Sequence, residues 1–155
     1  MTRRFASFLA LCLLSSCGSD RLTRSAIARE LNISSSGMKC KEAIVATIAD
    51  SAQRVVPCSR FSSDRDVQLL KDPDGHVLQV TVVWHAESSA AITVRDSVLQ
   101  QLTRITSREP RLCTSDDGLP VRVWQLNDTE YVALLGGRLS ERVRLILAMG
   151  VARCR

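Results

Sequence analysis

The stretch VQLLKDPDGHVLQVTVVW, residues 67–84, decides how this chain begins to fold. Two apolar runs, VQLLK and HVLQVTVVW, flank the four residues Asp72-Pro73-Asp74-Gly75. Proline presets one turn dihedral and glycine takes the positive φ, so the two runs are predicted to form a β-hairpin. In the second run apolar residues alternate with partly polar ones, which predicts one buried face bearing Leu78, Val80, Val82 and Trp84.

Three further strands are predicted towards the C-terminus, at VRVWQL (121–126), YVALLG (131–136) and RVRLILA (142–148). The pairs Asn127-Asp128 and Gly136-Gly137 supply the turns between them. Residues 139–149 can also be interpreted as a helix beginning at Ser140, but the alternation of Val143, Leu145 and Leu147 favours a strand.

Helical spacing is found in two places. Residues 37–54 and 87–107 each carry apolar or small residues three or four positions apart, and Pro57 prevents the first helix from continuing. The order helix, two strands, helix, three strands predicts an α+β fold. We expect a small antiparallel sheet of about five strands with two helices packed on one face.

The first twenty residues carry a separate signal. Arg3 and Arg4 precede an apolar run at residues 5–14, which is shorter than the about 20 residues that a membrane-spanning helix needs. The order of basic, apolar and small residues is typical of a secretory signal peptide. The sequence Leu14-Ser15-Ser16-Cys17 that ends it resembles the lipobox of bacterial lipoproteins.

This resemblance implies that residues 1–16 are a signal peptide that is cut off before Cys17. The Cys17 sulfur would then carry a diacylglycerol, and the new amine would be acylated, for example with palmitate. Residues 17–36 are expected to form the lipidated cysteine and a flexible tether, and residues 37–155 a single α+β domain. Gly18 stands where inner-membrane members usually have Asp, which implies the outer membrane, facing the periplasm. The alternative is a differently processed signal in which Cys17 is incidental.

Composition argues against nucleic acid as a partner. The formal charge of +5 falls to +3 when the two arginines of residues 1–16 are removed, and the remaining basic residues are dispersed along the chain. A nucleic-acid binder would concentrate them on one face, often with stacking aromatics. After residue 16 the only aromatic side chains are Phe61, Trp84, Trp124 and Tyr131.

Six cysteines are encoded, of which Cys12 leaves with the signal and Cys17 is the expected lipidation site. The other four are Cys40, Cys58, Cys113 and Cys154. In an oxidising compartment they predict two disulfides, and three pairings are possible. We favour Cys40–Cys58 and Cys113–Cys154, since each pair lies within one half of the chain. The C-x-x-C spacing used by many zinc sites and by redox-active cysteine pairs does not occur, so no metal and no cofactor are predicted.

Two positions are candidates for a functional site. His85, followed by Ser88 and Ser89, has the residue types of a hydrolase, but no G-x-S-x-G elbow surrounds either serine. The simpler interpretation is a strand end at the surface. Trp124 and Tyr131 lie on consecutive predicted strands and are a candidate partner surface, although such residues more often close a core.

These observations favour a binding or structural protein over an enzyme. The hypothesis is a lipid-anchored envelope protein that contacts another envelope protein as an assembly factor, chaperone or inhibitor. The alternatives are a small envelope hydrolase using His85 and a carrier of a small apolar ligand. A deep pocket at His85 would favour the hydrolase, a large dry cavity the carrier, and an exposed apolar groove or patch the protein partner.

Overall fold

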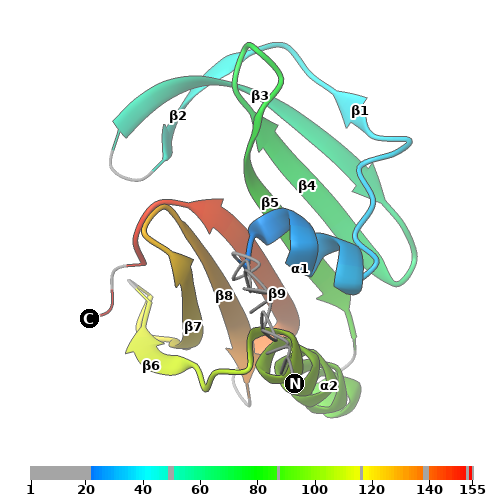
Figure 1. Ribbon diagram of the computed structural model, residues 1–155. Coiled ribbons are helices and arrows are strands. Elements are labelled where there is room, and N and C mark those ends of the chain that lie inside the picture. Colours follow the sequence, from blue (N-terminus) through cyan, green and yellow to red (C-terminus); the bar gives the residue numbers. More distant parts are fainter. Residues whose placement is uncertain are drawn as a thin grey trace, which may run out of the picture.

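The computed structural model describes residues 22–48, 51–86, 88–115, 117–137, 140–152 and 154, and Figure 1 shows its arrangement. The helices are α1 (Arg24–Glu30) and α2 (Ser88–Thr106). The strands are β1 (Lys39–Cys40), β2 (Ile44–Ile48), β3 (Ser51–Phe61), β4 (Arg65–Lys71), β5 (Val77–His85), β6 (Arg111–Thr114), β7 (Pro120–Asn127), β8 (Glu130–Gly137) and β9 (Ser140–Met149). No helix among these residues is long and apolar enough to cross a membrane.

All the strand pairs are antiparallel, and they form one sheet in the order β1-β3-β4-β5-β9-β8-β7-β6, with β2 also paired to β3. The chain therefore has an antiparallel sheet and two helices, as expected, but only α2 is a helix where the sequence predicts one. The expected number of about five strands is wrong, because the sheet has nine. The additional strands are β1, β2, β3 and β6.

The predicted hairpin joins β4 to β5. Gly75 has a φ of 91°, and its N–H donates to the Asp72 carbonyl at 3.0 Å, which closes the turn. One detail differs from the expected alternation. The register shifts between Leu70 and Lys71, so that Leu78 packs with Ile48 and Val55 instead of with the main core. A β-bulge therefore re-aims this side chain.

The helix predicted over residues 37–54 is wrong, because this segment forms β1, β2 and the start of β3. Ile44, Val45, Thr47 and Ile48 are β-branched, and such side chains pack well on a pleated surface. The long strand β3 offers β2 a partner from Ile44–Val55 to Ile48–Ser51. Tertiary pairing has thus overridden a helical spacing of apolar residues.

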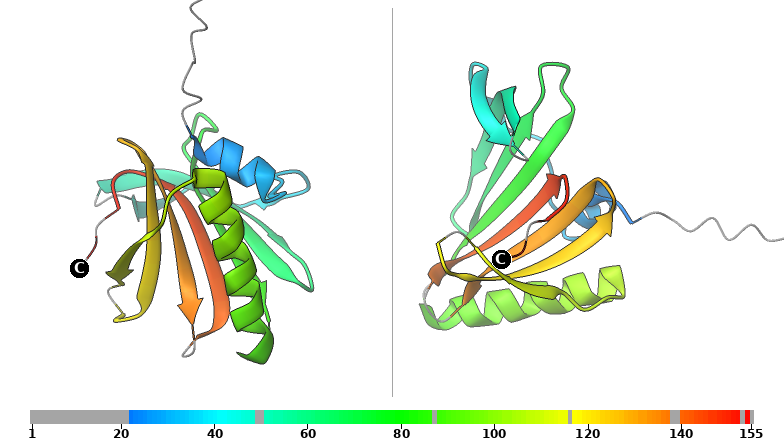
Figure 2. Two further views of the ribbon diagram at one scale, coloured as in Figure 1. Left: turned by 60° about the horizontal axis from the view of Figure 1, so that its bottom comes forward. Right: turned by 90° about the vertical axis from the view of Figure 1, so that its left-hand side faces the viewer.

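The main core lies between one face of the sheet and the two helices. Both helices contact β8 and β9, and Figure 2 shows α2 lying along the sheet. On the sheet side Val82, Leu145 and Leu147 are fully buried, and α2 contributes Val98 and Leu102. Residues 140–149 form the strand β9, as their alternation predicts.

Two disulfides join the pairs that the sequence favours. Cys40 and Cys58 are direct partners in the β1–β3 register, with their Cα atoms 3.9 Å apart. Cys113 on the edge strand β6 is joined to Cys154, beyond the end of β9, with a Cα separation of 4.8 Å. The Cys40–Cys58 bridge thus holds the edge strand β1, and the Cys113–Cys154 bridge holds β6 at the opposite edge of the sheet.

Helix α1 falls within the segment expected to be a tether. Thr23 caps it by accepting a hydrogen bond from the Ala26 N–H at 3.2 Å. Its Ile27 has no exposed surface and belongs to the main core. The folded domain therefore includes residues from Leu22 onward, and Cys17 lies outside the described residues.

The packing of α1 predicts a stability effect at Ile27. Replacing Ile27 with Ala should lower the free energy of unfolding by about 2–5 kcal/mol, because a fully buried side chain leaves a cavity. Val45→Ala is the matched control, since Val45 is 75% exposed and its truncation should cost no more than about 0.5 kcal/mol. Urea unfolding of wild type, Ile27→Ala and Val45→Ala measures both changes in the free energy of unfolding. Equal stabilities for Ile27→Ala and wild type would mean that α1 is not part of the domain.

Candidate functional site

The sheet face opposite the helices is only partly covered. On β4 and β5 it carries Gln68, Gln79 and Thr81, and Gln79 donates to the Thr81 hydroxyl at 3.1 Å. Gln68 is exposed, and the other two side chains are half-buried. A row of polar residues in the middle of a sheet is a surface that water can reach, and it is available to a partner.

A groove of about 490 Å³ lies on this face between β1–β2, β3 and the β4–β5 hairpin. We call it the open-face groove, and its lining includes Lys41, Ile44, Phe61, Gln68, Leu70 and Gln79. Ile44 is 50% exposed and Phe61 is 69% exposed. Large apolar side chains exposed beside one groove, with polar groups on its floor, are typical of a binding surface.

Two exposed lysines lie at the rim of the open-face groove, and Asp66, which pairs with His85, is the register partner of the lining residue Phe61. Lys41 lines the groove, and Lys39 is the register partner of Ser59, which also lines it. Both lysines are exposed, and the one acidic residue of this segment is Glu42. An apolar groove with this rim matches a ligand that carries apolar side chains and negative charge.

His85 is paired with a carboxylate that the sequence did not suggest. Its Nε2 lies 2.9 Å from Oδ2 of Asp66, with the two side chains 32% and 18% exposed. Asp96, on the following helix, accepts hydrogen bonds from Arg95 and not from His85. The side chains of Ser88 and Ser89 lie outside the described residues. His85 lines neither the open-face groove nor the three other hollows described in this part of the chain.

Trp124 and Tyr131 do not form a common surface. The register pairs Trp124 with Val132 and Gln125 with Tyr131, so the two aromatic side chains point to opposite faces of the sheet. Trp124 is 2% exposed, and its indole N–H donates to the Arg108 carbonyl at 3.0 Å. Burial raises the pKa of the Tyr131 phenol. Trp124 and Tyr131 therefore do not form one partner surface. Trp124 is a core residue, in agreement with the interpretation that such residues more often close a core.

The β4–β5 turn gathers Asp72, Asp74 and His76, whose ligand atoms lie within 4.8 Å of one another. Asp72 accepts from the His76 N–H at 2.8 Å and contacts the His76 ring nitrogen at 2.9 Å. The hydrogen bond to Asp72 raises the pKa of His76. Desolvation, the largest single influence on Asp72, would raise its pKa, but the hydrogen bonds and charge of His76 together lower it. These contacts are those of an exposed turn, and they account for the cluster without a metal.

A polar clasp made by Arg24, Asn127 and Glu130 fixes the start of α1. Arg24 Nε donates to Glu130 Oε1 at 2.9 Å, and its terminal nitrogens donate to the carbonyls of Leu78 and Val77 at 2.7 and 3.1 Å. The Asn127 amide donates to Glu130 Oε2 at 3.1 Å. Partial burial alone would raise the pKa of Glu130, but these hydrogen bonds and the Arg24 charge hold it below its ordinary value.

No family model, no curated protein and no solved structure matches this chain.

The residues of the open-face groove were missed by sequence reasoning. Ile44 lies in the segment 37–54 that is predicted as a helix, and Phe61 lies outside every predicted helix and strand. A signal was present, because the run Ile44–Ile48 is rich in β-branched residues and Val55-Val56 follow it. It indicates strands, but it does not indicate which of their side chains remain exposed.

The polar clasp predicts a pH-dependent contribution to stability. Glu130→Gln should lower the free energy of unfolding by about 1–3 kcal/mol at pH 7, because a charged, mostly buried hydrogen-bonding group is lost. The folded-state pKa of Glu130 is lowered, so its contribution is complete above the unfolded value and disappears as pH falls through the folded value. The difference between wild type and Glu130→Gln should therefore shrink below about pH 4.

Urea unfolding of both proteins between pH 7 and pH 3 measures this difference. Asp96→Asn is the control, since the Asp96 side chain is 55% exposed and its loss should change stability by less than about 1 kcal/mol. A difference for Glu130→Gln that stays constant across this range would contradict the assignment.

Proposed function

We propose that this chain is a lipid-anchored envelope protein that binds another envelope protein through the open-face groove. The observation that carries the proposal is the exposure of Ile44 and Phe61 on either side of one groove. Leaving such side chains in water is unfavourable, and covering them contributes about 25 cal/mol per Å² of apolar surface. A partner that fills the groove would provide that cover.

The groove's charge indicates the chemistry of the partner. Lys39 and Lys41 at the rim favour a segment with carboxylates beside its apolar side chains. The groove lies along strands and has polar side chains, Gln68, Gln79 and Thr81, on its floor. An extended peptide segment offers both backbone hydrogen bonds and alternating side chains to such a surface. The proposed ligand is therefore an extended acidic and apolar segment of an envelope protein.

The same observations support this function over its alternatives. The open-face groove has both apolar and polar walls and is lined by exposed side chains, whereas a carrier of an apolar ligand encloses it in an apolar cavity. The His85–Asp66 pair is the one observation that favours a hydrolase, and Asp66 is the register partner of the groove residue Phe61. Neither His85 nor Asp66 lines the groove itself, however, and a hydrolase needs its base beside a substrate pocket.

The proposed location of the protein in the cell depends on the lipobox resemblance. Leu14-Ser15-Ser16-Cys17 implies a lipid anchor on Cys17, and Gly18 implies the outer membrane. Two disulfides in a domain of this size are in keeping with an oxidising compartment such as the periplasm. The proposed location is the periplasmic side of the outer membrane.

The anchor predicts a definite mass for the membrane-extracted protein. Intact mass spectrometry should show loss of residues 1–16 and an added mass of diacylglycerol plus one fatty acid. Treatment with a thiol alkylating agent, without reductant, should add no mass, because the four remaining cysteines are bridged. A protein without acyl mass, or with four free thiols, would overturn the proposed address.

The groove predicts a specific cross-link in the cell envelope. With the photo-crosslinker p-benzoylphenylalanine in place of Phe61, irradiation should join the chain to one envelope protein. Ile44→Asp should abolish this adduct, because it places a charge in the apolar wall and repels an acidic segment. Leu112→Asp is the matched control, since Leu112 is 75% exposed on β6, away from the groove.

Peptide mapping of the adduct identifies which residues of the partner contact the groove. The cross-linked peptide should carry apolar residues flanked by Asp or Glu. An adduct that persists at the same yield in Ile44→Asp, or that is lost equally in Leu112→Asp, would contradict the proposed site. Thermal unfolding of each variant shows that the domain is still folded.

A further inference from the structure

The folded domain begins close to the proposed lipid anchor. Leu22 is followed directly by α1, whose Ile27 is fully buried and whose Arg24 is held by the polar clasp. Only residues 18–21 separate Cys17 from Leu22. Five residue steps reach no further than about 18 Å even when fully extended. The anchor therefore cannot place Leu22 far from the lipid headgroups.

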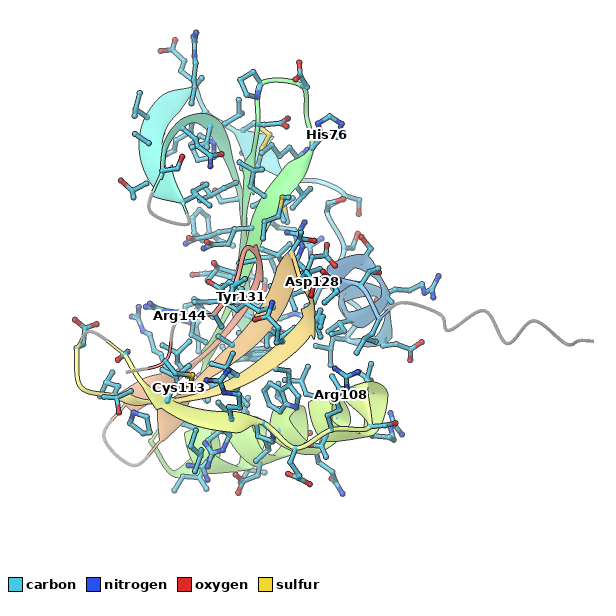
Figure 3. The ribbon with its side chains drawn as sticks, turned by 60° about the vertical axis from the view of Figure 1, so that its left-hand side comes forward. His76, Arg108, Cys113, Asp128, Tyr131 and Arg144 are labelled. Carbon is cyan, nitrogen blue, oxygen red and sulfur yellow. A yellow bond between two sulfur atoms is a disulfide. The ribbon has the colours of Figure 1, made fainter. Side chains whose placement is uncertain are left out.

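A definable surface surrounds Leu22. A hollow of about 810 Å³ is lined by Leu22, Thr23, Arg108, Asp128 and Thr129, together with parts of the clasp. We call these five residues the anchor-side surface. Arg108, Asp128 and Thr129 are exposed, and Figure 3 shows Arg108 and Asp128 on the side of the molecule that carries α1.

This surface has charge suited to a bilayer. The C-terminal end of α2 contributes one exposed guanidinium group to it, that of Arg108 just beyond the helix, whereas Arg104 in the last turn lines a different hollow. A guanidinium group binds phosphate through paired, charge-assisted hydrogen bonds. The single exposed carboxylate among the five residues is Asp128. Phosphate groups of phospholipid heads are thus a fitting counterpart.

The open-face groove is at a distance from this surface. Its strand β3 is separated from β8, where the clasp residue Glu130 begins the strand, by β4, β5 and β9. Four strand spacings correspond to about 19 Å across the sheet. The exposed residue Val45 on β2 lies beyond β3 and has no part in the anchor-side surface.

We propose that the anchored domain lies against the phospholipid headgroups through the anchor-side surface, with the open-face groove directed away from the bilayer. This inference rests on the proposed anchor at Cys17, and it names the orientation that the anchor imposes. A domain on a long tether would turn freely. A domain whose first helix is packed within about 18 Å of the lipid cannot do so.

The test uses the full acylated protein in vesicles of phosphatidylethanolamine and phosphatidylglycerol. p-Benzoylphenylalanine is placed at Thr129 in one protein and at Val45 in another, and both are irradiated. Intact mass should show a several-fold excess of phospholipid adduct at position 129 over position 45. Arg108→Gln should lower the yield at position 129, and Arg104→Gln, at a different hollow, is the matched control that should leave it unchanged.

A longer tether provides the decisive control. Inserting about twelve Gly and Ser residues between Gly18 and Ser19 gives the domain a flexible coil and freedom to turn. The phospholipid adduct at position 129 should then fall to the level seen at position 45. Loss of the excess only in the lengthened protein would support the inference.

Failure of the inference can be told apart from failure of the anchor. An acylated protein with equal lipid adducts at both positions, or with an unchanged excess after the insertion, would overturn the orientation alone. A protein without acyl mass would overturn the anchor and this inference together.

Discussion

The antiparallel pairing of β9 with β5 is the contact on which the domain depends. Strands β3, β4 and β5 form consecutive hairpins, as do β7, β8 and β9, and the sheet becomes continuous only where the last strand meets β5. The register runs from Gln79–Ala148 to His85–Arg142. Without it both strands would present unpaired backbone groups, and Leu145 and Leu147 would lose the apolar neighbours that bury them. Helix α2 spans this junction, because it contacts β5, β8 and β9.

The polar clasp extends this arrangement to the N-terminus. Arg24 joins the carbonyls that begin β5 to the carboxylate that begins β8, so one side chain ties α1 to both halves of the sheet. A charge this far from water is tolerated only when its donors are satisfied, and each nitrogen of the guanidinium has a partner. The clasp thus fastens α1 to the same sheet that carries the open-face groove.

Much of the fold could be predicted where the deciding chemistry is local. Asp72-Pro73-Asp74-Gly75 specifies a turn whatever lies around it, and the apolar spacing of residues 87–107 specifies α2. The disulfide pairs followed from their separation along the chain, although Cys40 lies in the segment predicted as a helix and the actual link joins two strands. The segment 37–54 was mispredicted because its apolar residues satisfy a helical spacing, while the competing strand partner, β3, is visible only in the folded sheet.

The candidate site was less predictable than the fold. Trp124 and Tyr131 were a candidate surface because they lie on consecutive strands, although a core role was favoured, and the register sends their side chains to opposite faces. Ile44 and Phe61 come together across β1, β2 and β3, which no local pattern connects. Turn chemistry, apolar periodicity, the cysteine pairs and the lipobox resemblance could be found in the chain itself, since each involves neighbours in sequence. Strand partners, register, the packing of α1 and the open-face groove were decided only by tertiary structure, because burial depends on which distant residues arrive to cover a side chain.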